Sequence, residues 1–329
     1  MSETSRPAYF RNAVLLFVSC LLFCVTAPSA RPAARQLRHP PGDFVRVNGK
    51  NIWYESEGEG EPLLLIAGGP GFSHAYFHPY FSALADSHRV IYFDAYGCGK
   101  SERAESPGAY SLAGAVEDVE GLRKALKLEK VNVLGHSYGG FVAQGYAVKY
   151  PNSLRRLVLA NTVASGPELQ IAQTRYNDEL RDQLPELWAK VRRLRARGVR
   201  SSAKEFQEAY GVPPVFHYFY NPENARQLPI TEPSLYNPDL WYAMAGDDAD
   251  FIVGGELARY DVRPRLRRLR KPVLVLAGRF DRNTFPRLTF RYKNYLPHAE
   301  FVVLEKSGHF PFIEEAEKSV AALRTFLAR

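Results

Sequence analysis

The chain has 329 residues, of which 46% are hydrophobic and 24% charged. This balance excludes wholesale disorder, and the length fits one α/β core with an insertion. The formal net charge is +8 at pH 7, but no zinc-binding spacing, aromatic RNA-binding motif or internal repeat accompanies the basic residues, so we expect no nucleic-acid partner.

The first thirty residues have the pattern of a secretory signal peptide. Arg6 and Arg11 precede an apolar run at residues 13–27, and small residues follow it up to Ala30. The run is shorter than the roughly 20 apolar residues that span a bilayer. We therefore expect a cleaved signal and an exported protein, periplasmic or secreted, without stable membrane insertion. An uncleaved signal that anchors the protein in the membrane is the alternative.

The predicted core begins after a Pro-containing linker at residues 31–42. Residues 44–47 and 51–55 alternate apolar and polar side chains around Asn48-Gly49, which predicts a β-hairpin. Compact apolar runs bounded by turn residues then predict buried parallel strands. These runs are residues 62–67, 89–93, 131–134, 157–160, 272–277 and 300–304.

Helical stretches separate these strands. The clearest is Ser111–Leu128, where apolar residues fall on one face behind Ser111 as N-cap, and a second is Phe141–Lys149. A hairpin followed by alternating strands and helices predicts a mostly parallel, doubly wound α/β sheet. Functional loops then belong at the carboxyl ends of the strands.

The alternation stops between residues 162 and 262, which we interpret as an inserted helical cap. The core therefore has two parts, residues 43–161 and 263–329. Aromatic side chains at 216–220 and 241–242 are candidates for packing or for lining a substrate pocket. Basic runs at 190–197 and 263–271 are interleaved with apolar residues, which favours amphipathic helices with a solvated cationic face.

The motif Gly135-His136-Ser137-Tyr138-Gly139 directly follows a predicted strand and precedes a predicted helix. A serine between two glycines in this context is typical of a nucleophile elbow, the tight turn that exposes a serine hydroxyl above an α/β sheet. The amino end of the following helix favours negative charge at the same point. We predict Ser137 as the nucleophile.

A serine hydroxyl is a weak nucleophile near neutral pH, so it needs a base and a group that orients the base. Asp281 follows the strand at 272–277, and His309 follows the strand at 300–304. Both therefore lie at the same edge of the sheet as Ser137, in the order serine, acid, histidine. We predict His309 as the base and Asp281 as its partner, with Glu168 as the alternative acid.

The loop Gly68-Gly69-Pro70-Gly71 follows the strand at 62–67, where an α/β-hydrolase fold takes its second oxyanion donor. Pro70 has no N–H, so the amides of Gly69 and Tyr138 are the predicted donors, with Gly71 as the alternative. The reaction expected from these groups requires neither a metal nor an organic cofactor.

Residues 97–101, Gly-Cys-Gly-Lys-Ser, end like a phosphate-binding loop. The complete pattern requires a glycine where Asp94 stands and a helix directly after Ser101. Neither condition is met, so nucleotide binding is not expected. Cys98 is the only cysteine after the predicted signal, which excludes an intramolecular disulfide in the mature chain. The number of subunits stays open.

These motifs resemble the proline iminopeptidase-like α/β hydrolases, serine peptidase family S33. The resemblance covers residues 44–326 and rests on the Gly68–Gly71 loop, residues 93–101, the Gly135–Gly140 elbow, Asp281 and His309. It implies an α/β-hydrolase fold with a cap. The implied activity is removal of an N-terminal residue, commonly proline, from small peptides through an acyl-enzyme.

Two positions depart from the family pattern. Ala67 stands where the family usually has histidine, and Arg282 stands where a glutamate usually helps to bind the substrate ammonium. A cation repels that ammonium, unless acids of the cap compensate. The alternatives are a hydrolase of small esters, amides or lactones, including substrates whose carboxylate pairs with Arg282, and a hydrolase-fold binding protein without activity.

Overall fold

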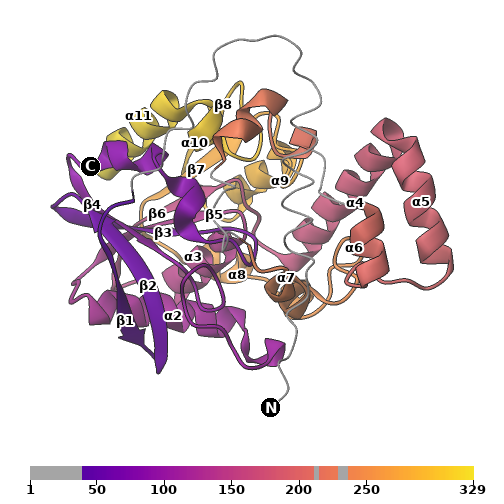
Figure 1. Ribbon diagram of the computed structural model, residues 1–329. Helices are drawn as coiled ribbons and strands as arrows, with labels where there is room; N and C mark the ends of the chain where they lie inside the picture. The colour runs from indigo at the N-terminus through magenta and orange to yellow at the C-terminus, as the bar shows by residue number, and fades with distance from the viewer. Residues whose placement is uncertain (1–38, 211–214, 229–235) are drawn as a thin grey trace, which may run out of the picture.

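The computed structural model describes residues 39–210, 215–228 and 236–329 (Figure 1). Among these residues the strands form one eight-stranded sheet in the order β1-β2-β4-β3-β5-β6-β7-β8. β1 pairs with β2, and β2 with β4, in antiparallel orientation, whereas all other neighbours are parallel. The strands are β1 Gly42–Val47, β2 Lys50–Glu57, β3 Glu61–Ile66, β4 His88–Phe93, β5 Val131–His136, β6 Leu154–Ala160, β7 Val273–Gly278 and β8 Glu300–Leu304.

The predicted hairpin and the six predicted runs all form strands. β5 extends two residues further than predicted because Gly135 and His136 continue the pairing with β6. β6 starts three residues earlier than predicted because the buried Leu154 already pairs with Val131 of β5, and the half-buried Arg155 and Arg156 interrupt the apolar pattern there. The carboxyl ends of β3, β5, β6, β7 and β8 lie at one edge of the sheet, since these strands are parallel.

Helices cover both faces of the sheet. α2 and α3 pack against each other on one face, and α10 and α11 lie on the other, with α11 against β8 (Figure 1). The helices are α2 Leu112–Ala125, α3 Tyr138–Lys149, α4 Gly166–Gln183, α5 Pro185–Ala196, α6 Lys204–Tyr210, α7 Pro238–Ala245, α8 Arg263–Leu266, α9 Pro286–Thr289, α10 Pro311–Glu314 and α11 Ala316–Leu327.

The sheet separates two hydrophobic clusters. Leu64 belongs to the cluster that contains α2 and α3, whereas its neighbours Leu63 and Leu65 belong to the cluster that contains α10 and α11. Successive side chains of a strand point to opposite faces, so a strand that is covered on both faces is apolar throughout. This packing explains why the runs are continuous rather than alternating, and it confirms the predicted doubly wound sheet.

Between β6 and β7 the chain forms α4 to α8. Figure 1 shows α4, α5 and α6 together to one side of the sheet. α5 contains the first basic run, with Val191 and Leu194 buried, as predicted. The second basic run, residues 263–271, forms only the four-residue helix α8, which is followed by turns. The prediction of an amphipathic helix over this run is therefore wrong. After Leu266 the N–H groups of Arg268 and Leu269 bond to carbonyls three residues back rather than four, so the chain tightens into turns instead of continuing as an α-helix.

The predicted signal peptide at residues 1–30 and most of the linker at 31–42 lie outside the described residues, so export stays a prediction. Within the part of the chain that the structure describes, no helix is long and apolar enough to cross a membrane.

Candidate active site

Ser137 occupies a strained turn between β5 and α3. Its backbone has φ 54° and ψ −123°, a combination that residues with a side chain rarely adopt. Its N–H donates to the carbonyl of Ala160 over 3.0 Å, and its carbonyl accepts from Gly140 N over 2.9 Å. The strain is therefore held by β6 on one side and by α3 on the other.

The glycines of the motif are required by close backbone contacts. A Cβ atom on Gly135 would lie 2.3 Å from the Gly139 carbonyl oxygen, and one on Gly139 would lie 2.1 Å from the oxygen of Ile66. α3 thus starts against β5 and against the end of β3. This is also why the helix begins at Tyr138, three residues before the predicted start.

Asp281 and His309 meet at the ends of β7 and β8. Nδ1 of His309 lies 3.1 Å from both carboxylate oxygens of Asp281, and both side chains are buried. The contact occupies one ring nitrogen and leaves Nε2 on the far edge of the imidazole. An imidazole oriented in this way has the arrangement that a general base requires.

Several donors keep the Asp281 carboxylate ionised. It accepts from Asn161 Nδ2 at 2.7 Å, from the backbone N–H groups of Asn283 and Thr284 at 2.8 and 3.0 Å, and from the Thr284 hydroxyl. Burial by itself raises the pKa of Asp281, but the charge of His309 and these hydrogen bonds hold it well below its ordinary value.

The hydrogen bonds of the described residues include none between the Ser137 hydroxyl and His309. His136, which directly precedes Ser137 in the chain, has its ring 4.9 Å from that of His309. In unliganded hydrolases the bond between nucleophile and base is often long and shortens when substrate binds. The role of each member of the triad therefore stays a prediction.

The backbone N–H groups of the two predicted oxyanion donors have no acceptor within the described part of the protein. Within the described chain, neither the N–H of Gly69 nor that of Tyr138 donates to a protein acceptor, and Tyr138 is the first residue of α3, where amides lack helical partners. A Cβ on the adjacent Gly68 would lie 2.9 Å from the Ser137 Cβ, so this loop passes directly beside the serine.

Comparison with known proteins agrees with this geometry. The family model of the alpha/beta hydrolase fold matches residues 61–316. The chain belongs to the α/β-hydrolase family. The proline iminopeptidase of Heyndrickxia coagulans is 33% identical to this hydrolase over 291 residues, which cover 86% of this chain and 97% of that protein. The proline iminopeptidase of Saccharolobus solfataricus is 27% identical over 293 residues, which cover 86% and 91%.

A solved structure extends the similarity to three dimensions. The crystal structure of proline iminopeptidase from Mycobacterium smegmatis matches the hydrolase with a TM-score of 0.69 at 26% identity, over 88% of this chain and 98% of that chain. The resemblance to proline iminopeptidase-like hydrolases and the prediction of an enzyme are thereby confirmed.

A chain of hydrogen bonds connects the oxyanion loop of the hydrolase with the predicted base. His136 Nε2 lies 2.8 Å from the carbonyl oxygen of His309 and must donate to it. Nδ1 of His136 therefore accepts from the Tyr76 hydroxyl at 2.9 Å, and that hydroxyl accepts from the Gly68 N–H at 2.6 Å. Burial, reinforced by the nearby His309, lowers the pKa of His136 to about 3, so its ring is neutral.

The structure adds one residue to the predicted site and places the alternative acid outside it. Asn161 was not predicted, although it follows β6 and donates to both Asp281 and the Gly308 carbonyl at 2.7 and 3.1 Å. Its position at the end of a parallel strand is the signal that identifies it. Glu168, the alternative acid, instead accepts from Ala164 N and the Tyr295 hydroxyl, at 3.0 and 2.8 Å.

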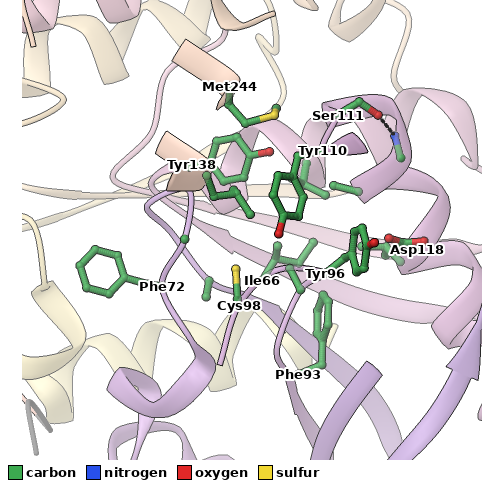
Figure 2. A pocket seen from close by; sticks show the side chains of 18 of the residues that line it. Ile66, Phe72, Phe93, Tyr96, Cys98, Tyr110, Ser111, Asp118, Tyr138 and Met244 are labelled. Carbon is green, nitrogen blue, oxygen red and sulfur yellow. Dashed lines mark hydrogen bonds between the residues drawn. The ribbon is translucent and has the colours of Figure 1, made fainter. Parts of the chain in front are cut away.

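A pocket lies beside the oxyanion loop (Figure 2). Gly68 and Tyr138 form part of its wall, and Tyr96 and Tyr110 from the segment between β4 and α2 and Met244 from α7 also line it. Its lining is mainly apolar and aromatic, but it includes neither the predicted nucleophile nor the predicted base. The pocket therefore adjoins the predicted oxyanion site but does not contain the predicted nucleophile or base.

Asp250 is a half-buried carboxylate in the insertion between β6 and β7. It accepts from the Tyr242 hydroxyl at 3.1 Å, and its backbone carbonyl accepts from Gln173 and Asn177 of α4 at 2.8 Å each. Burial raises the pKa of Asp250. Burial also raises the pKa of Tyr218, and the charges of Asp250 and Asp281 add to that shift.

Other acidic side chains of the cap have different environments. Asp248, Glu205 and Glu208 form ion pairs with arginine or lysine side chains, and Asp247 is exposed. Asp250 is different because no cation in the described parts of the chain forms an ion pair with it.

Proposed function

We propose that this hydrolase removes the N-terminal residue from small peptides through an acyl-enzyme. His309 takes the proton of the Ser137 hydroxyl as its oxygen attacks the first carbonyl of the substrate, and Asp281 holds the imidazole in place. The amides of Gly69 and Tyr138 stabilise the oxyanion. His309 then protonates the leaving amine, and water repeats the cycle to release the acid.

The observation that carries the choice of an aminopeptidase is the half-buried carboxylate of Asp250, which forms no ion pair within the described chain. Partial removal of a carboxylate from water without a cationic partner is unfavourable, and the α-ammonium of a peptide supplies that partner. Tyr218 lies beside the predicted base, because its ring is 6.0 Å from that of His309. The relatives named proline iminopeptidase support the same reaction.

Arg282, which stands where the family usually has glutamate, has neighbours that offset part of its positive charge. Its guanidinium lies 3.5 Å from Glu179 Oε2 and 5.6 Å from the ring of Phe216, so part of its charge is neutralised within the cap. A partly free cation at this place also supports the second candidate, hydrolysis of a small ester, amide or lactone that bears a carboxylate.

Paired substrates test the proposal. Wild type is assayed with a prolyl arylamide, its N-acetylated form, a p-nitrophenyl ester and a lactone. We expect turnover of the arylamide and little of its acetylated form. Turnover of the ester or lactone alone refutes the aminopeptidase. The variant Ser137→Ala should retain its fold and lose all activity and fluorophosphonate labelling, and substantial residual turnover refutes the serine mechanism.

The variant Asp250→Asn separates recognition from catalysis. We expect kcat/KM for the arylamide to fall about 100-fold, mainly through KM, while ester turnover stays nearly constant. The exposed Asp247→Asn is the matched control and should behave like wild type. An equal loss on both substrates assigns Asp250 a structural role instead.

A further inference from the structure

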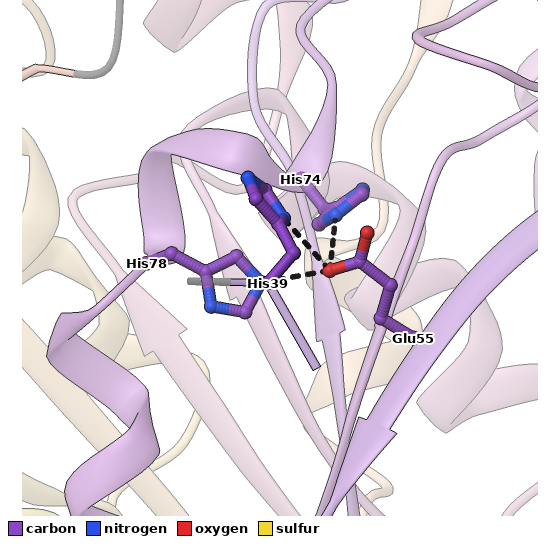
Figure 3. A group of neighbouring side chains, drawn as sticks. All are labelled: His39, Glu55, His74 and His78. Carbon is purple, nitrogen blue, oxygen red and sulfur yellow. Dashed lines mark hydrogen bonds and ion pairs between the residues drawn. The ribbon is translucent and has the colours of Figure 1, made fainter. Parts of the chain in front are cut away.

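Four side chains outside the active site converge on one point (Figure 3). They are His39 before β1, Glu55 of β2, and His74 and His78 at the two ends of the short helix η1, His74–Phe77. Each contributes one potential ligand atom, and these four atoms all lie within 4.8 Å of one another.

Three imidazole nitrogens surround a single carboxylate oxygen. Glu55 Oε2 lies 2.9 Å from His39 Nδ1, 3.1 Å from His74 Nε2 and 3.2 Å from His78 Nε2. A carboxylate oxygen accepts about two hydrogen bonds, so three donors exceed its capacity. The nitrogens of His74 and His78 indeed lack the geometry of a hydrogen bond.

Burial makes this arrangement costly without a further partner. The exposed fractions are 1% for Glu55, 3% for His74 and 0% for His78. His74 Nε2 and both ring nitrogens of His78 have no hydrogen-bond partner in the described chain. A buried polar atom left in this state costs about 1–3 kcal/mol, and a metal ion that accepts the nitrogen lone pairs removes the cost.

The distances suit a tetrahedral ion. Zinc binds imidazole nitrogen and carboxylate oxygen at about 2.0–2.1 Å, which separates neighbouring ligands of a tetrahedron by roughly 3.3 Å. The observed nitrogen–oxygen separations of 2.9, 3.1 and 3.2 Å require only a slight expansion. Three imidazoles and one carboxylate fill all four positions, which is the composition of a structural site rather than a catalytic one.

Groups around the cluster orient two of the ligands. His74 Nδ1 lies 2.8 Å from Asp94 Oδ1, so this nitrogen carries the proton and Nε2 presents its lone pair to the cluster. A carboxylate behind a histidine is the usual outer partner of a zinc ligand. The Trp53 indole donates to Glu55 Oε1 at 3.2 Å, which leaves Oε2 for the centre.

We propose that His39, Glu55, His74 and His78 form a binding site for a divalent transition-metal ion, most suitably Zn²⁺. The ion fastens the chain before β1 to η1. That helix also contains Tyr76, which accepts from the oxyanion-loop amide of Gly68. The site is independent of the proposed peptidase reaction and contributes to stability. The competing explanation is a metal-free network in which protonated imidazoles neutralise Glu55.

A metal titration of the wild-type chain distinguishes the two. The full-length protein, without a polyhistidine tag, is stripped with a chelator and titrated with Zn²⁺ in a calorimeter at neutral pH. We expect one ion bound per chain, a higher melting temperature, and, with Co²⁺ instead, the visible absorption bands of a tetrahedral ion. Absence of stoichiometric binding by both metals overturns the proposal, whatever the variants do.

Variants assign the binding to this cluster. His39→Ala changes the least buried ligand, whose side chain is 21% exposed, and His78→Gln changes a fully buried one. Each should weaken Zn²⁺ binding at least about 100-fold, because loss of a group behind the ligands already costs 10- to 100-fold. His298→Ala, an exposed histidine elsewhere, should bind as wild type does.

Turnover of the p-nitrophenyl ester shows whether these variants are folded. If both bind Zn²⁺ as tightly as wild type does, the ion lies elsewhere and the assignment is wrong. If His39→Ala binds no ion and remains active, the metal site and the serine chemistry are separate, as proposed.

Discussion

The backbone of Ser137 stores strain that the hydroxyl group alone does not explain. A residue with a side chain in such a conformation costs about 1–3 kcal/mol, whereas glycine adopts it with little strain. We expect Ser137→Gly to have a higher free energy of unfolding than Ser137→Ala, by about 1 kcal/mol, measured by urea denaturation. Ser106, exposed with φ −139° and ψ 146°, is the control. There glycine should be no better than alanine, and the same gain at both positions would contradict strain at Ser137.

The neutral ring of His136 predicts how stability depends on pH. In the unfolded chain this histidine takes up a proton near its ordinary pKa of about 6.5, whereas in the folded protein its pKa is about 3. The unfolded state therefore binds more protons between these values, and the free energy of unfolding falls as the pH falls. The contribution of this one group is a loss of roughly 3 kcal/mol at pH 4.

Urea denaturation at pH 7 and pH 4 checks this contribution in wild type and His136→Gln. The glutamine variant should be less stable at pH 7, because it breaks the bonds to Tyr76 and His309, but it should lose less stability on acidification. Groups that titrate equally in both proteins cancel in the comparison. Parallel pH dependences would show that His136 is already charged or is not buried.

At the scale of elements, the contact between β5 and α3 sets the position of the nucleophile. Gly135→Ala places a methyl group 2.3 Å from the Gly139 oxygen and 2.7 Å from the Ala143 Cβ. Because the obstacle is the backbone of a helix, α3 must shift. We expect a loss of about 1–3 kcal/mol in stability and at least a tenfold loss in ester turnover. Gly108→Ala, where a Cβ meets open space, should change neither.

Elements also explain which parts of the site are predictable from the sequence. Ser137, Asp281 and His309 each follow an apolar run, and parallel strands bring their ends to one edge whatever the intervening length. The same rule reaches Asn161, which was overlooked. The rule does not predict the position of Asp250, because the insertion contains no strand pattern from which a position could be inferred. Nor does it reach the cluster of His39, Glu55, His74 and His78, which depends on how η1 packs against β2.

At the scale of the whole molecule, Glu314 of α10 connects the insertion with the loop of the predicted base. Its carboxylate accepts from the N–H groups of Gly308, Tyr220 and Asn221 at 2.6, 3.1 and 3.0 Å, and from Asn224 Nδ2 at 3.2 Å. These four donors belong to two segments, residues 220–224 and the loop at Gly308, which Glu314 holds together. Loss of this carboxylate should therefore loosen both the insertion and the base.

Glu314→Gln tests this connection, because an amide cannot accept from all four donors. We expect a loss of about 1–3 kcal/mol, roughly tenfold lower kcat, and faster hydrogen exchange in peptides that cover residues 218–224 and 305–312. Glu317→Gln, exposed on α11, is the control and should be unchanged. Faster exchange at 218–224 alone, with normal kcat, would show that the base does not depend on the insertion.

Hydrogen bonds hold the backbone of His309 on both sides. Its N–H donates to the Tyr218 carbonyl at 2.7 Å, and its own carbonyl receives the bond from His136 at 2.8 Å. The segment that contains Tyr218 therefore cannot move away from this point without also moving the backbone of His309. Any opening of the insertion that leaves the imidazole in place has to occur away from Tyr218.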